Sequence, residues 1–188
     1  MRNVIRPALA MLLCLTLLTG MVYPLVVTGF AQLLFPANAA GTLVMRDGQA
    51  VGSALIGQQF TDPGYFWSRP SATGGHPYNA AASGGSNLGP LNPALREAVT
   101  QRMAAFKVAD PLNTLPVPVD MVTASASGLD PHISVAAALY QLQRVAKVRG
   151  IAPDQLHTLV GAHTEGRILG FLGEPRVNVL ELNLALDE

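Results

Sequence analysis

The most prominent pattern in the chain is one long apolar run near its N-terminal end. It extends from Ala8 to Phe35 without a charged residue. A helix needs about 20 predominantly apolar residues to cross about 30 Å of hydrocarbon, so this run can span a membrane with some tilt. Pro24 lies inside the run, where its missing N–H predicts a kink or a helix end. We therefore expect a membrane anchor in residues 1–35.

Charge on the short segment before the run predicts the orientation of this anchor. Arg2 and Arg6 precede it, and positive charge stays on the cytoplasmic side of a membrane. Residues 36–188 would then form a single exoplasmic domain. The alternative is a cleaved signal peptide, because Ala37-Asn38-Ala39 resembles a cleavage site. The apolar region of a signal peptide is only about 7–15 residues long, so the length favours an uncleaved anchor.

The first elements after the anchor are a hairpin and a long irregular segment. Two short apolar runs in residues 42–56 flank Asp47-Gly48, a preferred turn of a β-hairpin. Residues 64–90 show no helical or strand period and are rich in Gly, Ser, Asn and Pro. They also carry several aromatic residues, which disordered segments lack. We therefore expect an ordered surface loop.

Helical periodicity dominates the rest of the chain. Asn92-Pro93 opens a helix that continues to about Lys107, with an apolar stripe at Leu95, Val99, Met103 and Phe106. Further helices are predicted over residues 134–149, before Gly150, and over residues 153–162.

Two segments of the same part of the chain are less regular. Residues 119–123 favour a strand. The C-terminal residues 177–186 alternate in part like a strand, but Asn178 and Glu181 suit a capping box, so a helix is preferred. The predicted fold is a single N-terminal transmembrane helix (1–35) followed by a small α+β exoplasmic domain (36–188) with a β-hairpin, a long ordered loop and three to four helices.

Composition excludes several classes of function. The part after the anchor carries 12 Asp and Glu against 10 Lys and Arg, so it has no basic face and nucleic-acid binding is not expected. Cys14 is the only cysteine and lies within the apolar run, so the domain has no disulfide. The histidines do not follow a zinc-binding spacing such as H-E-x-x-H, so no metal site is expected.

The stretch SASGLDPHIS has the side-chain types of a serine hydrolase. In such a site the serine reaches the imidazole and a carboxylate holds the other ring nitrogen. Asp130 and His132 are two positions apart, and residues at that spacing do not face each other on a helix. Asp130 and Ser134 suit a helix entrance instead, which is the favoured interpretation. A membrane-anchored exoplasmic hydrolase using Ser125 or Ser127 with His132 remains the alternative.

A glycine-rich stretch, SGGSNLGP, follows the aromatic part of the loop. Its backbone N–H groups could cradle phosphate, and it shares S-G-G with the signature loop of ABC-type transport ATPases. It lacks the G-K-[ST] of a Walker A loop, so a tight turn with glycine at positive φ is preferred. The candidate nucleotide contacts are Ser83, Gly84, Gly85, Ser86 and Asn87.

Taken together, these motifs resemble the C subunit of the bacterial Kdp-type potassium-transporting ATPase. The resemblance covers nearly the whole chain and rests on the N-terminal span and six motifs in order: VGSALIGQ (51–58), YFWSRPSA (65–72), YNAAASGGSNLGP (78–90), VTASASGLDPHIS (122–134), HTEGR (163–167) and PRVNVLELNLALD (175–187). One departure is Val135, where the family's helix is expected to begin with proline. Ser134 can still cap that helix.

The resemblance implies a non-catalytic accessory subunit of a high-affinity, ATP-driven potassium uptake complex in the bacterial inner membrane. Its partners would be a channel-like potassium-translocating subunit, a P-type subunit that hydrolyses ATP and a small single-span subunit. Members of the family are described as catalytic chaperones that raise the ATP affinity of the ATP-hydrolysing subunit, with the SGGS loop as the suggested nucleotide contact.

The predicted orientation disagrees with that last suggestion, because it places the SGGS loop outside the cell. We therefore expect the partner subunits to handle ATP and potassium, with no cofactor bound directly by this chain. Thr16 and Gly20 form a small-xxx-small pair in the anchor that would let another helix approach closely. The candidate partner contacts are Thr16, Gly20, Phe66, Arg69, Asp130 and His132.

Overall fold

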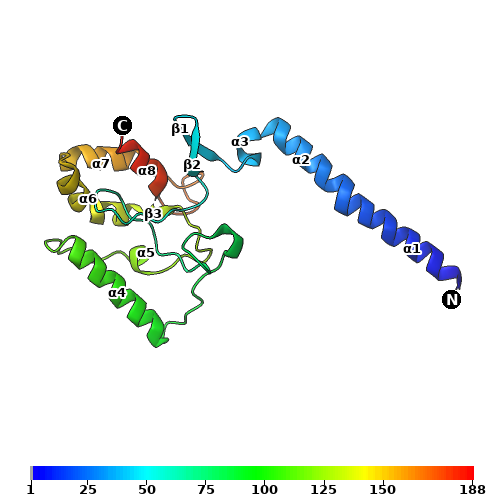
Figure 1. The fold of residues 1–188 in the computed structure, drawn as a ribbon, viewed down its shortest axis with the longest axis horizontal. Helices are drawn as coiled ribbons and strands as arrows, with labels where there is room; N and C mark the ends of the chain where they lie inside the picture. The colour runs from blue at the N-terminus through cyan, green and yellow to red at the C-terminus, as the bar shows by residue number, and fades with distance from the viewer. Residues whose placement is uncertain (1) are drawn as a thin grey trace. The chain divides into compact units, whose positions relative to one another are not determined.

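The computed structural model describes residues 2–188. They fall into two compact units, the first ending at Val51 and the second running from Gly52 to Glu188. Figure 1 shows a long helix in the first unit and a mixed group of helices and short strands in the second. The predicted class, an apolar N-terminal helix followed by a small α+β domain, is confirmed.

The apolar run forms a helix that is long enough to cross a membrane. It consists of α1 (Arg2–Leu17), a π-helical turn η1 (Leu18–Val22) and α2 (Tyr23–Leu34), and 31 of these residues, Val4–Leu34, are apolar enough for a span. The π turn ends two residues before Pro24, which cannot donate a backbone hydrogen bond. The helix therefore continues past Pro24, and the disturbance expected there takes the form of a π turn.

The predicted hairpin is confirmed. After the short helix α3 (Pro36–Ala39), strands β1 (Leu43–Arg46) and β2 (Gln49–Ser53) pair through the turn at Asp47-Gly48. Asp47 has φ 51° and Gly48 has φ 77°, the two left-handed conformations that a type I′ turn requires.

The second unit contains the predicted helices together with strands that the sequence pattern did not indicate. Helices α6, α7 and α8 lie together, and α4 extends along another side of the domain (Figure 1). The elements are η2 (Ala80–Ala82), α4 (Pro93–Ala109), α5 (Val119–Val122), β3 (His132–Ser134), α6 (Val135–Arg149), α7 (Pro153–Ala162), β4 (Thr164–Glu165), β5 (Arg176–Asn178) and α8 (Val179–Ala185).

Side-chain caps set the ends of these helices as expected. Asn92 accepts a hydrogen bond from the Ala94 N–H at 3.0 Å, and Ser134 accepts one from Ala137 at 3.0 Å. Asn178 caps α8, which confirms the helical interpretation of the C-terminal segment. Gly150 follows α6 in the left-handed conformation, with φ 67°.

A three-stranded antiparallel sheet in the order β3-β5-β4 lies beside these helices. In the register, Val177 of the central strand pairs with Ile133 on one side and with Thr164 on the other. The prediction of a strand at residues 119–123 is wrong, because this segment forms α5. There Asp120 accepts hydrogen bonds from both the N–H and the hydroxyl of Ser134, which fixes α5 against the start of α6.

The core of the domain surrounds one face of α6. Ala137, Ala138 and Val145 are 0% exposed and pack with side chains of α7, β5, α8 and the loop. The stripe predicted on α4 is used only in part: Phe106 is buried, whereas Met103 is 47% exposed. Most of α4 therefore stands away from this core.

Two buried amide side chains hold the irregular segment in place. Asn183 of α8 accepts from the Phe66 N–H at 2.8 Å and donates to the Phe66 carbonyl at 2.9 Å. Gln141 of α6 does the same for Trp67, at 2.8 and 3.1 Å. Each amide thus replaces a neighbouring strand as hydrogen-bond partner, which explains how a loop without regular pairing remains ordered.

A buried arginine completes this anchorage. Arg144 is 3% exposed, donates to the carbonyl groups of Pro63 and Tyr65, and bonds to Gln141 at 2.7 Å. Its guanidinium also stacks on the Trp67 ring, 4.3 Å from the centroid. Burial lowers the pKa of Arg144 to about 10.

Candidate functional site

The glycine-rich stretch SGGSNLGP and the stretch SASGLDPHIS lie against each other. The Gly84 N–H donates to the Ser127 carbonyl at 2.9 Å, and the Ser83 hydroxyl donates to the same oxygen at 3.0 Å. The glycine-rich segment therefore uses these two donors on the neighbouring loop of its own chain. Donors engaged in this way do not fit a phosphate cradle, which needs free N–H groups.

The glycines at this junction serve close backbone approach. A Cβ on Gly85 would lie 3.0 Å from the Ala126 carbonyl oxygen, and neither Gly84 nor Gly85 has a positive φ. The expected turn with glycine at positive φ is therefore wrong for these two positions. Asn87 adopts that conformation instead, with φ 52°. On the facing loop, Gly128 has φ 68°, and a Cβ there would lie 2.8 Å from the Gly84 carbonyl oxygen.

A chain of charged side chains crosses the surface next to this junction. Arg69 bonds to Asp130 at 3.0 Å, and the His132 Nδ1 lies 3.4 Å from the other Asp130 oxygen. The His132 Nε2 lies 3.8 Å from Glu165, which in turn bonds to Arg176 at 2.8 Å. Two of the predicted partner contacts, Asp130 and His132, are therefore direct neighbours, and Arg69 joins them.

Hydrogen bonding determines the charge state of Asp130. Burial acts to raise its pKa, but the hydrogen bonds from His132 and the charge and hydrogen bond of Arg69 outweigh that effect and hold the pKa below its ordinary value. Asp130 also accepts from the His132 backbone N–H at 3.0 Å. The carboxylate thus fixes the turn that leads into β3.

This arrangement corrects the interpretation of SASGLDPHIS in two ways. Asp130 and His132 were expected to point apart because they were placed on a helix, but His132 begins strand β3 and the two side chains are in contact. The helix entrance also lies further along the chain than Asp130, at the cap residue Ser134.

The geometry does not match that of a serine hydrolase. Both imidazole nitrogens of His132 face carboxylates, so neither is directed at a hydroxyl. Ser125 and Ser127 use their hydroxyl oxygens to accept backbone N–H groups within their own turn, at 2.9 and 3.1 Å. Across residues 2–188, no hydroxyl is hydrogen-bonded to the His132 ring.

The remaining predicted contacts fall in different environments. Phe66 is 0% exposed, so it is a core side chain and is not available at the surface for a partner. Thr16 and Gly20 are exposed on the N-terminal helix, and a Cβ on Gly20 would meet nothing within 4 Å. Gly20 lies within the π turn, so the pair spans a change in helical register.

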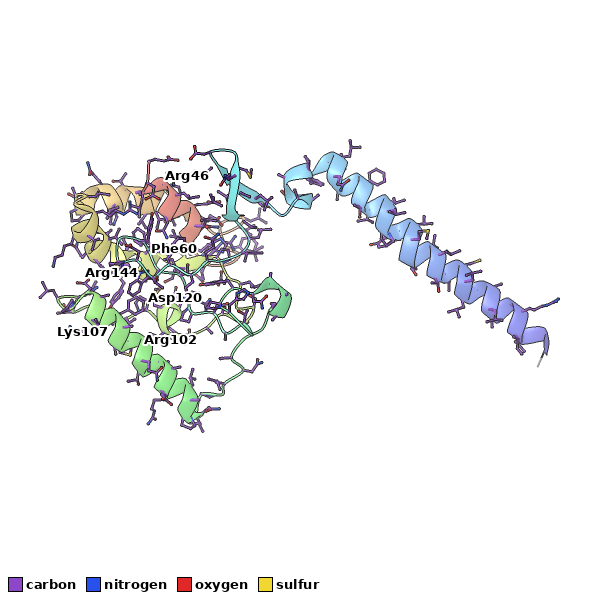
Figure 2. All side chains as sticks on the ribbon, in the orientation of Figure 1. Arg46, Phe60, Arg102, Lys107, Asp120 and Arg144 are labelled. Atoms are coloured by element: carbon purple, nitrogen blue, oxygen red, sulfur yellow. The ribbon has the colours of Figure 1, made fainter. Side chains whose placement is uncertain are left out.

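A pocket that the sequence did not indicate lies on the other side of Arg69. It has a volume of about 300 Å³ and aromatic walls formed by Phe60, Trp67, Tyr78 and Phe106. The Trp67 and Phe106 rings are 5.3 Å apart. We refer to it as the aromatic pocket; Arg102 of α4 also lines it, and this side chain is labelled together with Phe60 in Figure 2.

The sequence contained a partial signal for the buried role of Gln141, which was not predicted. Gln141 lies four positions after Ala137 and four before Val145, so it is a polar residue on the buried stripe of its helix. Such a position requires a buried hydrogen-bond partner. No group of three His, Cys, Asp or Glu side chains that could hold a metal ion occurs in the part of the chain that the structure describes.

Comparisons with known proteins give a consistent result. Residues 5–188 match the family model described as "KdpC: K+-transporting ATPase, c chain". A protein of Polaromonas naphthalenivorans is 67% identical over 187 residues, covering 100% of this chain and 95% of that protein. Proteins of Variovorax paradoxus and Herpetosiphon aurantiacus are 64% and 63% identical, each with 100% of this chain and 97% of the relative covered. All three are named potassium-transporting ATPase KdpC subunit.

Proposed function

The chain belongs to the KdpC family, the c chains of K+-transporting ATPases, and from this we propose that it is a non-catalytic accessory subunit of a potassium uptake complex. The observation that carries the proposal is the match over residues 5–188, which includes both the apolar helix and the whole domain. The two parts are therefore proposed to act together, as an anchor and a docking domain.

In this proposal the partner subunits carry out the chemistry. They are a channel-like subunit that moves potassium, a P-type subunit that hydrolyses ATP and a small single-span subunit. Two observations support a non-catalytic role: His132 faces carboxylates with both ring nitrogens, and the donors of Ser83 and Gly84 are engaged within the domain.

Orientation decides how the subunit affects ATP affinity. The charge rule predicts that residues 36–188 lie outside the cell, where they cannot reach cytoplasmic ATP. We infer that any increase in the ATP affinity of the ATP-hydrolysing subunit is indirect, through docking of the domain or packing of the anchor. The domain would then stabilise the potassium-translocating subunit.

A single thiol tests the orientation. Ser86 is exposed on the glycine-rich segment, and Cys14 is the only cysteine to remove. Ser86→Cys in a Cys14→Ser background should react with a membrane-impermeant thiol reagent on intact cells. Reaction only after the membrane is opened would reverse the orientation, and it would make direct contact between this domain and cytoplasmic ATP physically possible.

Removing the domain tests the accessory role. A chain ending at residue 51 keeps the anchor but lacks the second unit. It should give a lower yield of purified complex or a weaker apparent affinity for potassium in ATPase assays. Normal yield, turnover and potassium affinity without the domain would show that the proposed role is wrong.

A further inference from the structure

The aromatic pocket contains a positive charge that the domain does not neutralise. Arg102 projects from α4 (Figure 2), and its guanidinium donates to the Val122 carbonyl at 2.6 Å. Among residues 2–188, no carboxylate lies within ion-pair distance of Arg102. Arg102 is half-buried, and this burial lowers the pKa of its side chain. A desolvated charge of this kind favours an anionic partner.

Arg69, which also lines the pocket, differs from Arg102 in this respect. Its terminal nitrogen is paired with Asp130 at 3.0 Å, so its charge is already compensated. The pocket therefore offers one cation without a paired carboxylate among the described residues, Arg102, which is suited to a carboxylate.

The rest of the lining is mostly apolar or aromatic. It includes Phe60, Trp67, Phe106 and Met121, with Gln59, Ser68 and Ser71 as polar exceptions. A volume of about 300 Å³ is at the lower limit for small-molecule pockets, which span about 300–1,000 Å³. Space of this size accommodates one or two side chains.

The helix that carries Arg102 also exposes apolar side chains. Met103, the residue after Arg102, is 47% exposed, and Val108 of the same helix is 81% exposed. Apolar surface next to a lined pocket is typical of protein interaction sites, where a buried anchor is surrounded by weaker contacts. A protein segment would cover both features, whereas a small molecule would fill only the pocket.

We propose that the aromatic pocket is a docking site for a segment of a partner subunit that places a carboxylate side chain on Arg102 and an adjacent apolar side chain between Phe60, Trp67 and Phe106. The proposal rests on the proposed function, because it requires an assembled complex. It adds the chemical character of the contacted segment: acidic and apolar residues next to each other.

Photo-crosslinking in the assembled complex tests this assignment. A photoreactive amino acid is placed at Ala105, which lines the pocket, and in a control at Ala104, which is exposed on α4 but does not line it. Crosslinking is performed in membranes, and mass spectrometry identifies the linked peptide. Ala105 should link to one partner peptide containing Asp or Glu beside an apolar residue. Ala104 should not.

Two further variants separate docking from folding. Arg102→Met keeps the apolar stem and should reduce the Ala105 crosslink by about tenfold or more, because it leaves the partner carboxylate unpaired. Ala105→Trp fills the mouth of the pocket without removing a native contact, and should weaken binding of the chain to its partners, whereas Ala104→Trp should not. Circular dichroism checks that each variant is folded.

Several results would overturn the assignment. They are a chain that co-purifies with its partners but gives no crosslink from Ala105, a linked peptide without a carboxylate, and a crosslink that Arg102→Met leaves unchanged. A small carboxylate found in the pocket by native mass spectrometry, with no partner peptide, would also refute it. If the chain does not co-purify with any partner subunit, the proposed function itself fails, and the docking site fails with it.

Discussion

The amide of Asn183 is expected to be one of the most important side chains for the stability of the domain. It is 2% exposed and makes two hydrogen bonds to the main chain of Phe66, which is 0% exposed. Asn183→Ala removes both bonds and leaves the Phe66 N–H and carbonyl without partners in a site that water does not reach.

The loss of unfolding free energy in Asn183→Ala follows from these two unpaired backbone groups. Leaving a buried donor or acceptor unsatisfied costs about 1–3 kcal/mol, so two of them give about 2–6 kcal/mol. Domains of this size have a total unfolding free energy of about 5–15 kcal/mol. Asn183→Ala should therefore remove a large share of the stability, and could leave the domain partly unfolded at 37 °C.

Trp67 provides the assay, because it is the only tryptophan in the chain and is bonded to Gln141 within the same anchorage. Urea unfolding of the full chain in detergent is followed by its fluorescence. The matched control is Glu181→Ala, an exposed residue in the first turn of the same helix, which should lower the free energy of unfolding by no more than about 1 kcal/mol, the usual contribution of an acidic side chain at that position. If Asn183→Ala shifts the unfolding midpoint no more than Glu181→Ala, the account of the loop anchorage is refuted.

Two further predictions concern the loop junction and its charges. Gly128→Ala should lower the unfolding free energy by about 1–3 kcal/mol, because φ is 68° and the new Cβ would lie 2.5 Å from Thr73; Gly89→Ala, with open space around it, should be neutral in the same urea assay. Because the folded pKa of Asp130 is depressed, its contribution to stability is present above the ordinary pKa of about 3.9 and is lost as pH falls through the folded value. The stability difference between the wild type and Asp130→Asn should therefore shrink in urea titrations below about pH 4, and a difference that does not change with pH would contradict this.

Local signals in the sequence were sufficient for the apolar N-terminal helix, the hairpin and the helix ends. Asn92, Ser134 and Gly150 act through atoms within a few residues of themselves, so their effect can be seen in a short window. The same is true of Asp47-Gly48, whose two positive φ angles determine the turn.

What could not be predicted depends on residues far apart in the chain. The sheet is built from strands of two or three residues, too short for a periodic signal, and His132 pairs with Asn178 across the sequence. The strand expected near Asp120 was overridden by its hydrogen bonds to Ser134. The aromatic pocket likewise combines the loop with α4, and no local pattern connects Trp67 to Arg102.

The amide anchorage of the loop also affects how this protein can change over generations. The amides of Asn183 and Gln141 hydrogen-bond to main-chain atoms of Phe66 and Trp67. Any residue except proline supplies the same N–H and carbonyl groups, so these four hydrogen bonds do not themselves depend on the loop's side chains, although the burial of the Phe66 ring and the stacking of the Trp67 ring do. Substitutions at exposed positions of the loop can alter the surface offered to other molecules while Gln141 of α6 and Asn183 of α8 continue to hold the backbone in position.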